Sequence, residues 1–215
     1  MHAAEVLPGL LGGCRHPGGL ELTDRAVALA GLPRGAVVLD VGCGDGVTAE
    51  HLQSRHGLRV VGVDVATALL RQGRDRCAGL DLREAAADRL PLADASVDAV
   101  LAECVLSILD EPSAALEEWA RVLRPGGRLI VNDLFRRADP DAARRLLAER
   151  GFAVEAWQDH SSALARLVWD LAAPGVAEPG ARATVPAALR GGGGLGYYLC
   201  VARRPRHDGG DGSTV

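Results

Sequence analysis

Short apolar runs alternate with longer segments of helical periodicity from Ala36 to the end of the chain. Strands buried on both faces appear as short continuous runs rich in Val, Leu and Ile, whereas an amphipathic helix repeats apolar residues every three or four positions. The pattern predicts strands over residues 36–42, 58–64, 82–87, 96–103, 128–133, 152–159 and 197–204. It predicts helices over residues 47–57, 67–79, 111–127, 141–150 and 161–172.

Glycine and proline mark the expected helix ends. Gly57 should end the first of these helices, and Pro112 suits the first turn of the third, which residues 125–127 (Pro-Gly-Gly) should end. Gly73 lies inside the second helix and weakens its prediction, since glycine costs about 1 kcal/mol relative to alanine in a helix.

Strands that alternate with helices imply a doubly wound, mostly parallel α/β sheet, because each crossover helix packs on a sheet face. The 215 residues are enough for one domain of ordinary size. We expect an N-terminal lid or helical segment over 1–34, the main domain over 35–204 and a disordered tail over 205–215. The ligand crevice of such a sheet lies at the carboxyl ends of its strands.

Composition narrows the classes of function. The chain is 48% hydrophobic, but no run approaches the roughly 20 apolar residues of a membrane span. A net charge of −4 and an aromatic content of 3% argue against nucleic acid as a partner. The five cysteines are widely spaced without a C-x-x-C pair, so they predict neither a disulfide framework nor a metal site. Reduced thiols in a cytoplasmic protein are expected.

A glycine-rich turn follows the first predicted strand. In "DVGCGDG" (40–46), Gly42, Gly44 and Gly46 allow a tight turn and let backbone N–H groups approach a nucleotide-like ligand. Asp64 ends the second strand, where an acid can accept hydrogen bonds from both hydroxyls of a ribose. Val47 occupies the third glycine position of the dinucleotide fingerprint, which disfavours NAD.

These motifs carry a family resemblance. "VLDVGCGDG", "GVD", "ADRLPLADASVDAV" and "RVLRPGGRLIVND" together resemble class I S-adenosylmethionine-dependent methyltransferases, in the right order over most of 36–135. The resemblance implies a seven-stranded sheet whose last strand is antiparallel, with S-adenosyl-L-methionine as cofactor. It places the methionine part on the glycine loop near Asp40 and the ribose on Asp64. Ala86 stands where the family usually has an acid for the adenine amine, so Asp88 or backbone groups are expected to serve instead.

The acceptor should meet the methyl group at the end of the fourth strand, where Glu103 and Cys104 lie. A soft thiolate or selenolate needs little general-base help, whereas an amine or alcohol normally needs a placed base. Cys104 is a candidate for contact with the acceptor, and packing as a small core residue is the alternative. His160, beside Asp159, is the candidate general base, with a helix-capping role as its alternative.

Two narrower resemblances concern the acceptor. "ECVLSILDEPSAALEEWARVLRPGG" is similar to arsenite methyltransferases, in which Cys104 would match a metalloid-binding cysteine. Glu103 replaces that family's Asn, and no Cys follows the sixth strand, so a complete three-thiolate arsenic site is not predicted.

The second is that residues 14–33, 157–164 and 196–203 resemble a bacterial group of methyltransferases associated with selenium metabolism. In that group the position of Cys14 can be selenocysteine. Cys14 and His16, set among glycines, would then form a mobile lid over the acceptor, and a frayed N-terminus is the alternative.

The sequence therefore predicts a methyltransferase acting on a small molecule, with a sulfur, selenium or metalloid acceptor favoured. An ordinary oxygen, nitrogen or carbon methyltransferase is the alternative within the enzymes, and it should depend on His160 or Glu103. A non-catalytic cofactor-binding partner in selenium handling is the alternative from another class. The oligomeric state is not predicted.

Overall fold

The structure is a computed structural model that describes residues 16–172 and 194–205. Its strands are β1 (Val37–Val41), β2 (Arg59–Asp64), β3 (Asp81–Glu84), β4 (Val97–Glu103), β5 (Leu123–Arg136), β6 (Ala153–Asp159) and β7 (Leu195–Arg203). Its helices are α1 (Gly19–Ala30), α2 (Val47–His56), α3 (Thr67–Arg76), the short η2 (Leu106–Ile108), α4 (Pro112–Val122), α5 (Ala142–Glu149) and α6 (Ser161–Ala172).

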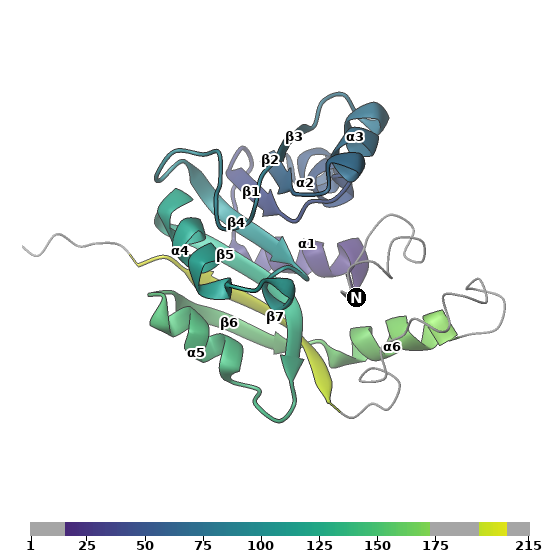
Figure 1. The fold of residues 1–215 in the computed structure, drawn as a ribbon, viewed down its shortest axis with the longest axis vertical. Helices are drawn as coiled ribbons and strands as arrows, with labels where there is room; N and C mark the ends of the chain where they lie inside the picture. Colours follow the sequence, from purple (N-terminus) through teal and green to yellow (C-terminus); the bar gives the residue numbers. More distant parts are fainter. Residues whose placement is uncertain (1–15, 173–193, 206–215) are drawn as a thin grey trace, which may run out of the picture.

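The strands form one seven-stranded sheet in the order β3-β2-β1-β4-β5-β7-β6 (Figure 1). β7 runs antiparallel to both of its neighbours, β5 and β6, and the pairs from β3 to β5 are parallel. The predicted doubly wound fold with an antiparallel last strand is confirmed. β1 and β4 are neighbours at the centre of the sheet, so the glycine loop and the end of β4 lie at the same edge.

Helices cover both faces of the sheet. In Figure 1, α4 and α5 lie in front of the sheet and α1 lies behind it. Successive strand residues point to opposite faces, so Val38 belongs to the core under α1, α2, α3 and α6, while Leu39 belongs to the core under α4 and α5. Trp119 of α4 is fully buried in the second core and donates its indole N–H to the carbonyl of Ala87 at 2.9 Å.

Most predicted helix ends are observed. α4 begins at Pro112, and Gly57 caps α2 in the left-handed conformation, with φ 64°. The largest boundary error is in the helix predicted over 111–127, which ends at Val122, so that β5 already starts at Leu123. The helix predicted over 67–79 also ends early, at Arg76. The N–H of Gly126 donates to the carbonyl of Arg204, the residue after β7, and the N–H of Arg204 donates to the carbonyl of Gly127. These backbone hydrogen bonds explain why Pro-Gly-Gly belongs to a strand here.

Gly73 has a packing reason that its sequence position did not reveal. A Cβ atom at this position would lie 2.3 Å from the backbone oxygen of Asp45 and 2.7 Å from a methyl carbon of Leu82. The missing side chain therefore lets α3 lie directly against the glycine loop.

The described helices are short or carry charged residues. None within residues 16–172 combines the length and the apolar run needed to cross a bilayer.

Candidate active site

The loop between β1 and α2 is shaped by its glycines. Gly42, Gly44 and Gly46 all have positive φ angles, 71°, 55° and 76°. The backbone N–H groups of Gly42 and Cys43 both donate to the carbonyl of Val63, at 2.8 and 3.0 Å, which fixes the loop to the end of β2. A Cβ at Gly42 would lie 2.5 Å from a methyl carbon of Val105, so this position also requires glycine for space.

Asp64 organises the same loop. One carboxylate oxygen accepts the N–H of Gly44 and the other accepts the N–H of Ala66, both at 2.8 Å. A carboxylate offers about four lone-pair positions, so two remain after these bonds. Asp64 can therefore hold the glycine loop and accept the hydroxyl groups of a ribose at the same time.

Asp40 lies near the carboxyl end of the central strand β1 and has only 3% of its surface exposed. Its Oδ2 atom has no hydrogen-bond partner among the described residues. Burial raises the pKa of this carboxyl well above its usual range, and the nearby charge of Glu103 raises it further. A buried acceptor without a donor matches the ammonium group of a methionine moiety. The glycine loop, Asp64 and Asp40 thus fit the cofactor that the sequence motifs imply.

The turn that follows β3 contains Asp88, the residue expected to contact the adenine of the cofactor. Asp88 is exposed in a turn closed by the isolated pairing of Ala86 with Arg89. β3 pairs in parallel with β2, and Asp64 lies opposite Glu84, so this turn follows at the same edge as the ribose acid. Val65 is 68% exposed directly after Asp64 and offers an apolar surface there. A role for Asp88 stays a prediction.

Glu103 is the centre of a buried polar network at the end of β4. Its carboxylate lies 3.0 Å from Nε2 of His16 and accepts hydrogen bonds from Thr23 at 2.9 Å, Thr48 at 3.3 Å and Asn132 at 2.8 Å. Burial opposes ionisation of Glu103, but His16 and the hydroxyl donors outweigh it and lower the pKa. The network therefore holds an ionised carboxylate and ties α1, α2 and β5 to β4.

Sequence reasoning included Glu103 but missed three of its partners. Thr23 and Glu103 are 80 positions apart, and Thr48 and Glu103 are 55 apart. Asn132 lies opposite Glu103 in the pairing of β4 with β5, which is the one signal that strand register could have supplied. His16 was noted only as part of a lid.

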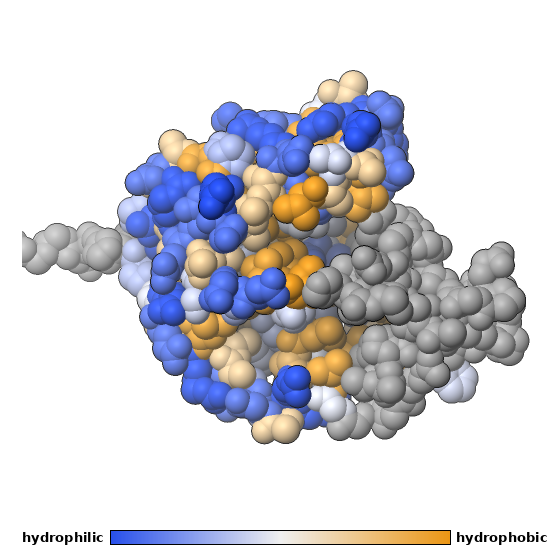
Figure 2. Space-filling view, viewed as in Figure 1, coloured by the Kyte–Doolittle hydropathy of each residue, from blue (hydrophilic) through white to orange (hydrophobic). Residues whose placement is uncertain are grey.

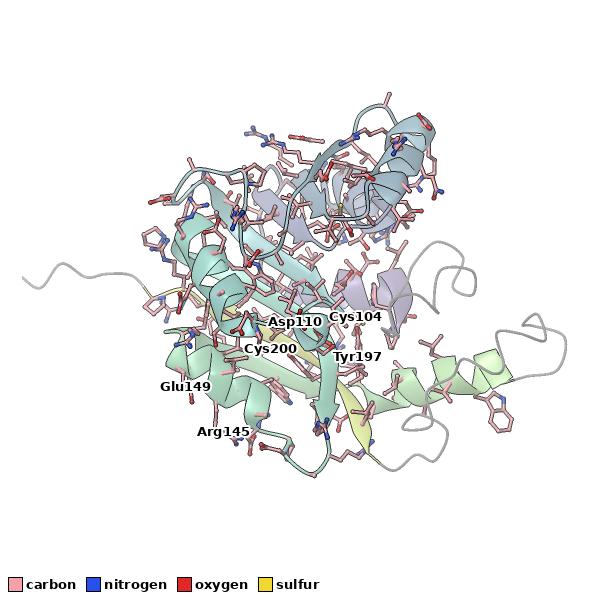
Figure 3. The ribbon with its side chains drawn as sticks, viewed as in Figure 1. Cys104, Asp110, Arg145, Glu149, Tyr197 and Cys200 are labelled. Carbon is pink, nitrogen blue, oxygen red and sulfur yellow. The ribbon has the colours of Figure 1, made fainter. Side chains whose placement is uncertain are left out.

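Cys104 follows Glu103 in an uncommon backbone conformation, with φ 58°. Its N–H donates to the carbonyl of Asn132 at 2.7 Å, and its half-buried thiol lies 3.4 Å from the hydroxyl of Tyr197 on β7 (Figure 3). Burial raises the pKa of Tyr197 well above its usual range, and contact with Cys104 adds to the rise. The phenol therefore stays protonated and can donate a hydrogen bond.

His160 is separated from the end of β4 by two strands. His160 follows β6, the edge strand, and β5 and β7 stand between β6 and β4. At the usual strand spacing of about 4.8 Å, this places His160 on the order of 14 Å from Cys104. Its ring lies 3.2 Å from the Gln158 side chain, and burial, followed by the charge of Arg25, lowers its pKa. Cys14 lies outside the described residues.

The surface around this edge is partly apolar. Figure 2 shows hydrophobic residues in the middle of the visible face and hydrophilic residues along its outer margin. Ile108 of η2 is 42% exposed, one turn beyond Cys104. Small-molecule sites are commonly lined by such apolar residues.

Comparison with known proteins places these features in a family. The family model described as "Methyltransferase domain" matches residues 39–131, which include the glycine loop, Asp64 and the β4 end. An O-methyltransferase of Pyrenophora dematioidea is 31% identical, with 86% of this chain and 83% of the relative covered. An arsenite methyltransferase of Halobacterium salinarum is 31% identical over 54% of this chain and 33% of the relative.

Among solved structures, the [4+2]-cyclase SpnF has a TM-score of 0.74 and 26% identity, with 86% of this chain and 80% of that chain covered. The chain spans 40 to 48% of the length of several other curated relatives. The extended match to a methyltransferase, the family model and the fit of the cofactor residues agree with one another. The chain belongs to the class I S-adenosylmethionine-dependent methyltransferases.

Proposed function

We propose that this protein methylates a small molecule through a soft nucleophilic atom: sulfur, selenium or trivalent arsenic. The observation that carries the proposal is the thiol of Cys104, 3.4 Å from the Tyr197 hydroxyl at the end of β4. When bound, S-adenosylmethionine supplies a methyl group on a sulfonium centre, and its transfer to an acceptor's lone pair leaves neutral S-adenosylhomocysteine.

The protonation states at the β4 end support a soft acceptor. Glu103 is ionised, but His16, Thr23, Thr48 and Asn132 all engage its carboxylate. Tyr197 keeps its proton because burial raises its pKa. Neither group is therefore free to act as a general base, and the half-buried thiol of Cys104 is the group left to contact the acceptor. A soft nucleophile that ionises near neutral pH needs no more than this.

Cys104 has two possible tasks in this proposal. Its thiol can donate a weak hydrogen bond to a sulfur or selenium acceptor, or its thiolate can bind a trivalent arsenic centre. The similarity to an arsenite methyltransferase over about half of this chain supports the second task. Orientation of the acceptor by Cys104, whose thiol is held by the buried Tyr197 hydroxyl, then accounts for catalysis mainly through proximity.

The test is an acceptor screen with thiols, selenide, arsenite, catechols and amines, read out as release of S-adenosylhomocysteine. We expect turnover with a soft acceptor. Cys104→Gly, chosen because glycine tolerates the positive φ, should lower kcat/KM for that acceptor at least tenfold. Cys77→Ala removes another half-buried thiol and should change kcat/KM less than twofold.

A second candidate is methylation of an oxygen atom. The O-methyltransferase relative, matched over 83% of its length, favours it. This function requires a base, for which His160 is the candidate. Turnover of a catechol that is lost in His160→Gln but kept in Cys104→Gly would replace the soft-acceptor proposal. Cofactor binding without S-adenosylhomocysteine release would contradict both functions, an outcome that matters because one solved relative is a cyclase.

A further inference from the structure

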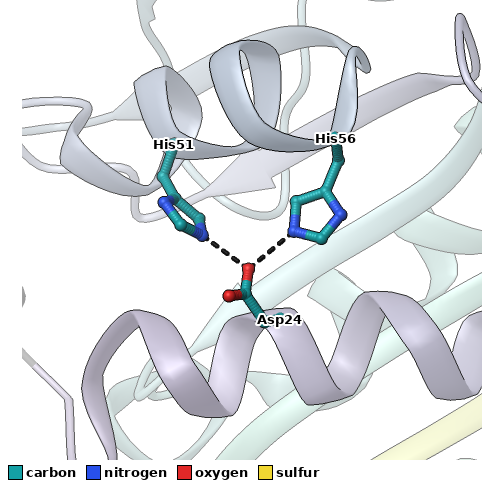
Figure 4. Close-up of side chains that lie close together, drawn as sticks. All are labelled: Asp24, His51 and His56. Atoms are coloured by element: carbon teal, nitrogen blue, oxygen red, sulfur yellow. Dashed lines mark hydrogen bonds and ion pairs between the residues drawn. The ribbon is translucent and has the colours of Figure 1, made fainter.

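We propose that Asp24, His51 and His56 form a binding site for a first-row transition metal dication such as Zn²⁺. The site joins α1 to α2 and is separate from the residues that hold the cofactor. In Figure 4, His51 and His56 extend from α2 toward Asp24 of α1, which lies between them. The inference does not depend on the identity of the methyl acceptor.

The three side chains converge on one point. Nε2 of His51 and Nε2 of His56 lie 2.5 and 2.6 Å from the same oxygen of Asp24, Oδ1. The three potential ligand atoms all lie within 4.8 Å of one another. This convergence brings two imidazole nitrogens and one carboxylate oxygen, each from a separate side chain, around a common centre.

The ligand set selects the class of ion. Two imidazole nitrogens and one carboxylate suit Zn²⁺, Co²⁺ and Ni²⁺, whereas Mg²⁺ and Ca²⁺ prefer oxygen ligands throughout. Each imidazole must present the lone pair of Nε2 and keep its proton on Nδ1. The exposed fractions of the side chains, 35% for Asp24, 19% for His51 and 23% for His56, leave access for the ion and for water as a further ligand.

The required movement is small. Tetrahedral coordination with bonds of about 2.1 Å places ligand atoms about 3.4 Å apart. Both nitrogens must therefore move away from Oδ1 by somewhat less than about 1 Å. His56 is the last residue of α2, before the left-handed Gly57, where the helix end can adjust. Rotation of the partly exposed Asp24 side chain can provide the remaining increase in the distances between Oδ1 and the two nitrogens.

The site lies beside the polar network of Glu103. Asp24 follows Thr23 on α1, and His51 comes three residues after Thr48 on α2. Thr23 and Thr48 both donate hydrogen bonds to Glu103. A metal ion bound by Asp24 and the two histidines would therefore fix together the two helices whose threonines hold this carboxylate. We infer that metal binding steadies α1 over the cofactor side of the molecule.

The first test is titration of the full chain with Co²⁺ and with Zn²⁺, followed by visible spectroscopy and calorimetry. We expect one ion per chain and a Co²⁺ spectrum without the charge-transfer band of a thiolate ligand. In the double variant His51→Gln/His56→Gln the affinity should fall at least tenfold, while the amide N–H groups can still donate to Asp24 and keep α1 in place. Asp24→Asn should weaken binding as well.

Two matched variants serve as controls. Glu21→Gln removes an exposed carboxylate from the same helix, and His160→Gln removes a histidine outside the cluster, so neither should change metal affinity. Hydrogen exchange of the α1 amides should slow on Zn²⁺ addition in the wild type and not in the double variant. Equal metal affinity in wild type and double variant, or a thiolate band with Co²⁺, would overturn the proposal whatever the acceptor screen finds.

Discussion

Asp40 lowers the stability of the cofactor-free protein at neutral pH, although it is suited to bind the cofactor. It is a buried carboxyl group whose Oδ2 lacks a partner among the described residues, and burial together with Glu103 raises its pKa. The native state therefore binds this proton more tightly than the unfolded chain does. As the pH rises from the ordinary aspartate range through the raised native pKa, this difference lowers the free energy of unfolding. A bound ammonium group would relieve the same cost.

We therefore expect Asp40→Asn to increase the free energy of unfolding of the cofactor-free protein at neutral pH and to weaken S-adenosylmethionine binding at least tenfold. The gain in stability should shrink as the pH falls toward the ordinary aspartate pKa of about 4, and it should vanish below that pKa, where the wild-type carboxyl group is protonated in both states. Urea denaturation between pH 4 and 8 and calorimetry measure the two effects. Asp81→Asn is the control, since Asp81 is ion-paired with Arg83 and its pKa is lowered. A less stable variant with unchanged cofactor affinity contradicts this account.

Cys104 combines the thiol that we propose contacts the acceptor with a strained backbone. A non-glycine residue in the left-handed region costs roughly 1–2 kcal/mol. With φ at 58°, Cys104→Gly should unfold with a free energy about 1 kcal/mol higher than Cys104→Ala. At Cys77, with φ at −142°, the order of the glycine and alanine variants should reverse. Chemical denaturation of the four variants tests the backbone assignment independently of activity.

At the scale of single elements, replacing Gly73 of α3 by alanine should destabilise the protein, although the same change stabilises an isolated helix. Glycine inside a helix is normally destabilising, and Gly73→Ala in an isolated helix would gain about 1 kcal/mol. Here the new methyl group would lie 2.3 Å from the carbonyl oxygen of Asp45. The helix would have to move away from the glycine loop.

Gly73→Ala should therefore lower the free energy of unfolding, by about 1–3 kcal/mol, and weaken cofactor binding. Gly79→Ala is the matched control, because nothing lies within 4 Å of a Cβ at that position. Thermal denaturation and calorimetry provide the measurements. Equal effects of the two substitutions would show that α3 does not position the loop.

Across the whole molecule, the cofactor residues lie where β1, β2 and β4 end together, between the two helical layers. Ligand binding at this edge should therefore stabilise the complete domain. S-adenosylhomocysteine at 100 times its dissociation constant should raise the free energy of unfolding by about 2.7 kcal/mol.

Asp64→Ala should abolish most of this stabilisation at the same ligand concentration. The ribose would lose a charge-assisted partner worth about 1.5–3 kcal/mol, and the N–H groups of Gly44 and Ala66 would lose their acceptor. A thermal-shift titration of both proteins measures the difference. Undiminished stabilisation in Asp64→Ala would refute the placement of the ribose.

Hydrophobic periodicity and the positions of glycine and proline were sufficient to predict the order of strands and helices and the type of sheet. Alternation of apolar runs with helical periodicity predicted all seven strands, and the strand predicted over 82–87 is present as the shorter β3. The boundary error at Leu123 arose because Leu123 pairs with Val97 of β4 and residues 126 and 127 pair with Arg204, contacts that are distant in sequence. Glycine spacing predicted the tight turn after β1, which the positive φ angles of Gly42, Gly44 and Gly46 confirm, since left-handed turns depend on residue type. Its role in holding the cofactor, together with Asp64, stays a prediction.

The contacts that give the site its chemistry were decided only by the tertiary structure. Glu103 and Cys104 were evident candidates, but the engagement of Glu103 by the threonines of α1 and α2 and the contact of Cys104 with Tyr197 join residues 55 to 93 positions apart. The pairing of Asp24 with two histidines of α2 is of the same kind. Periodicity determines which residues face a core, while only the packing of one helix against another determines which polar groups meet there.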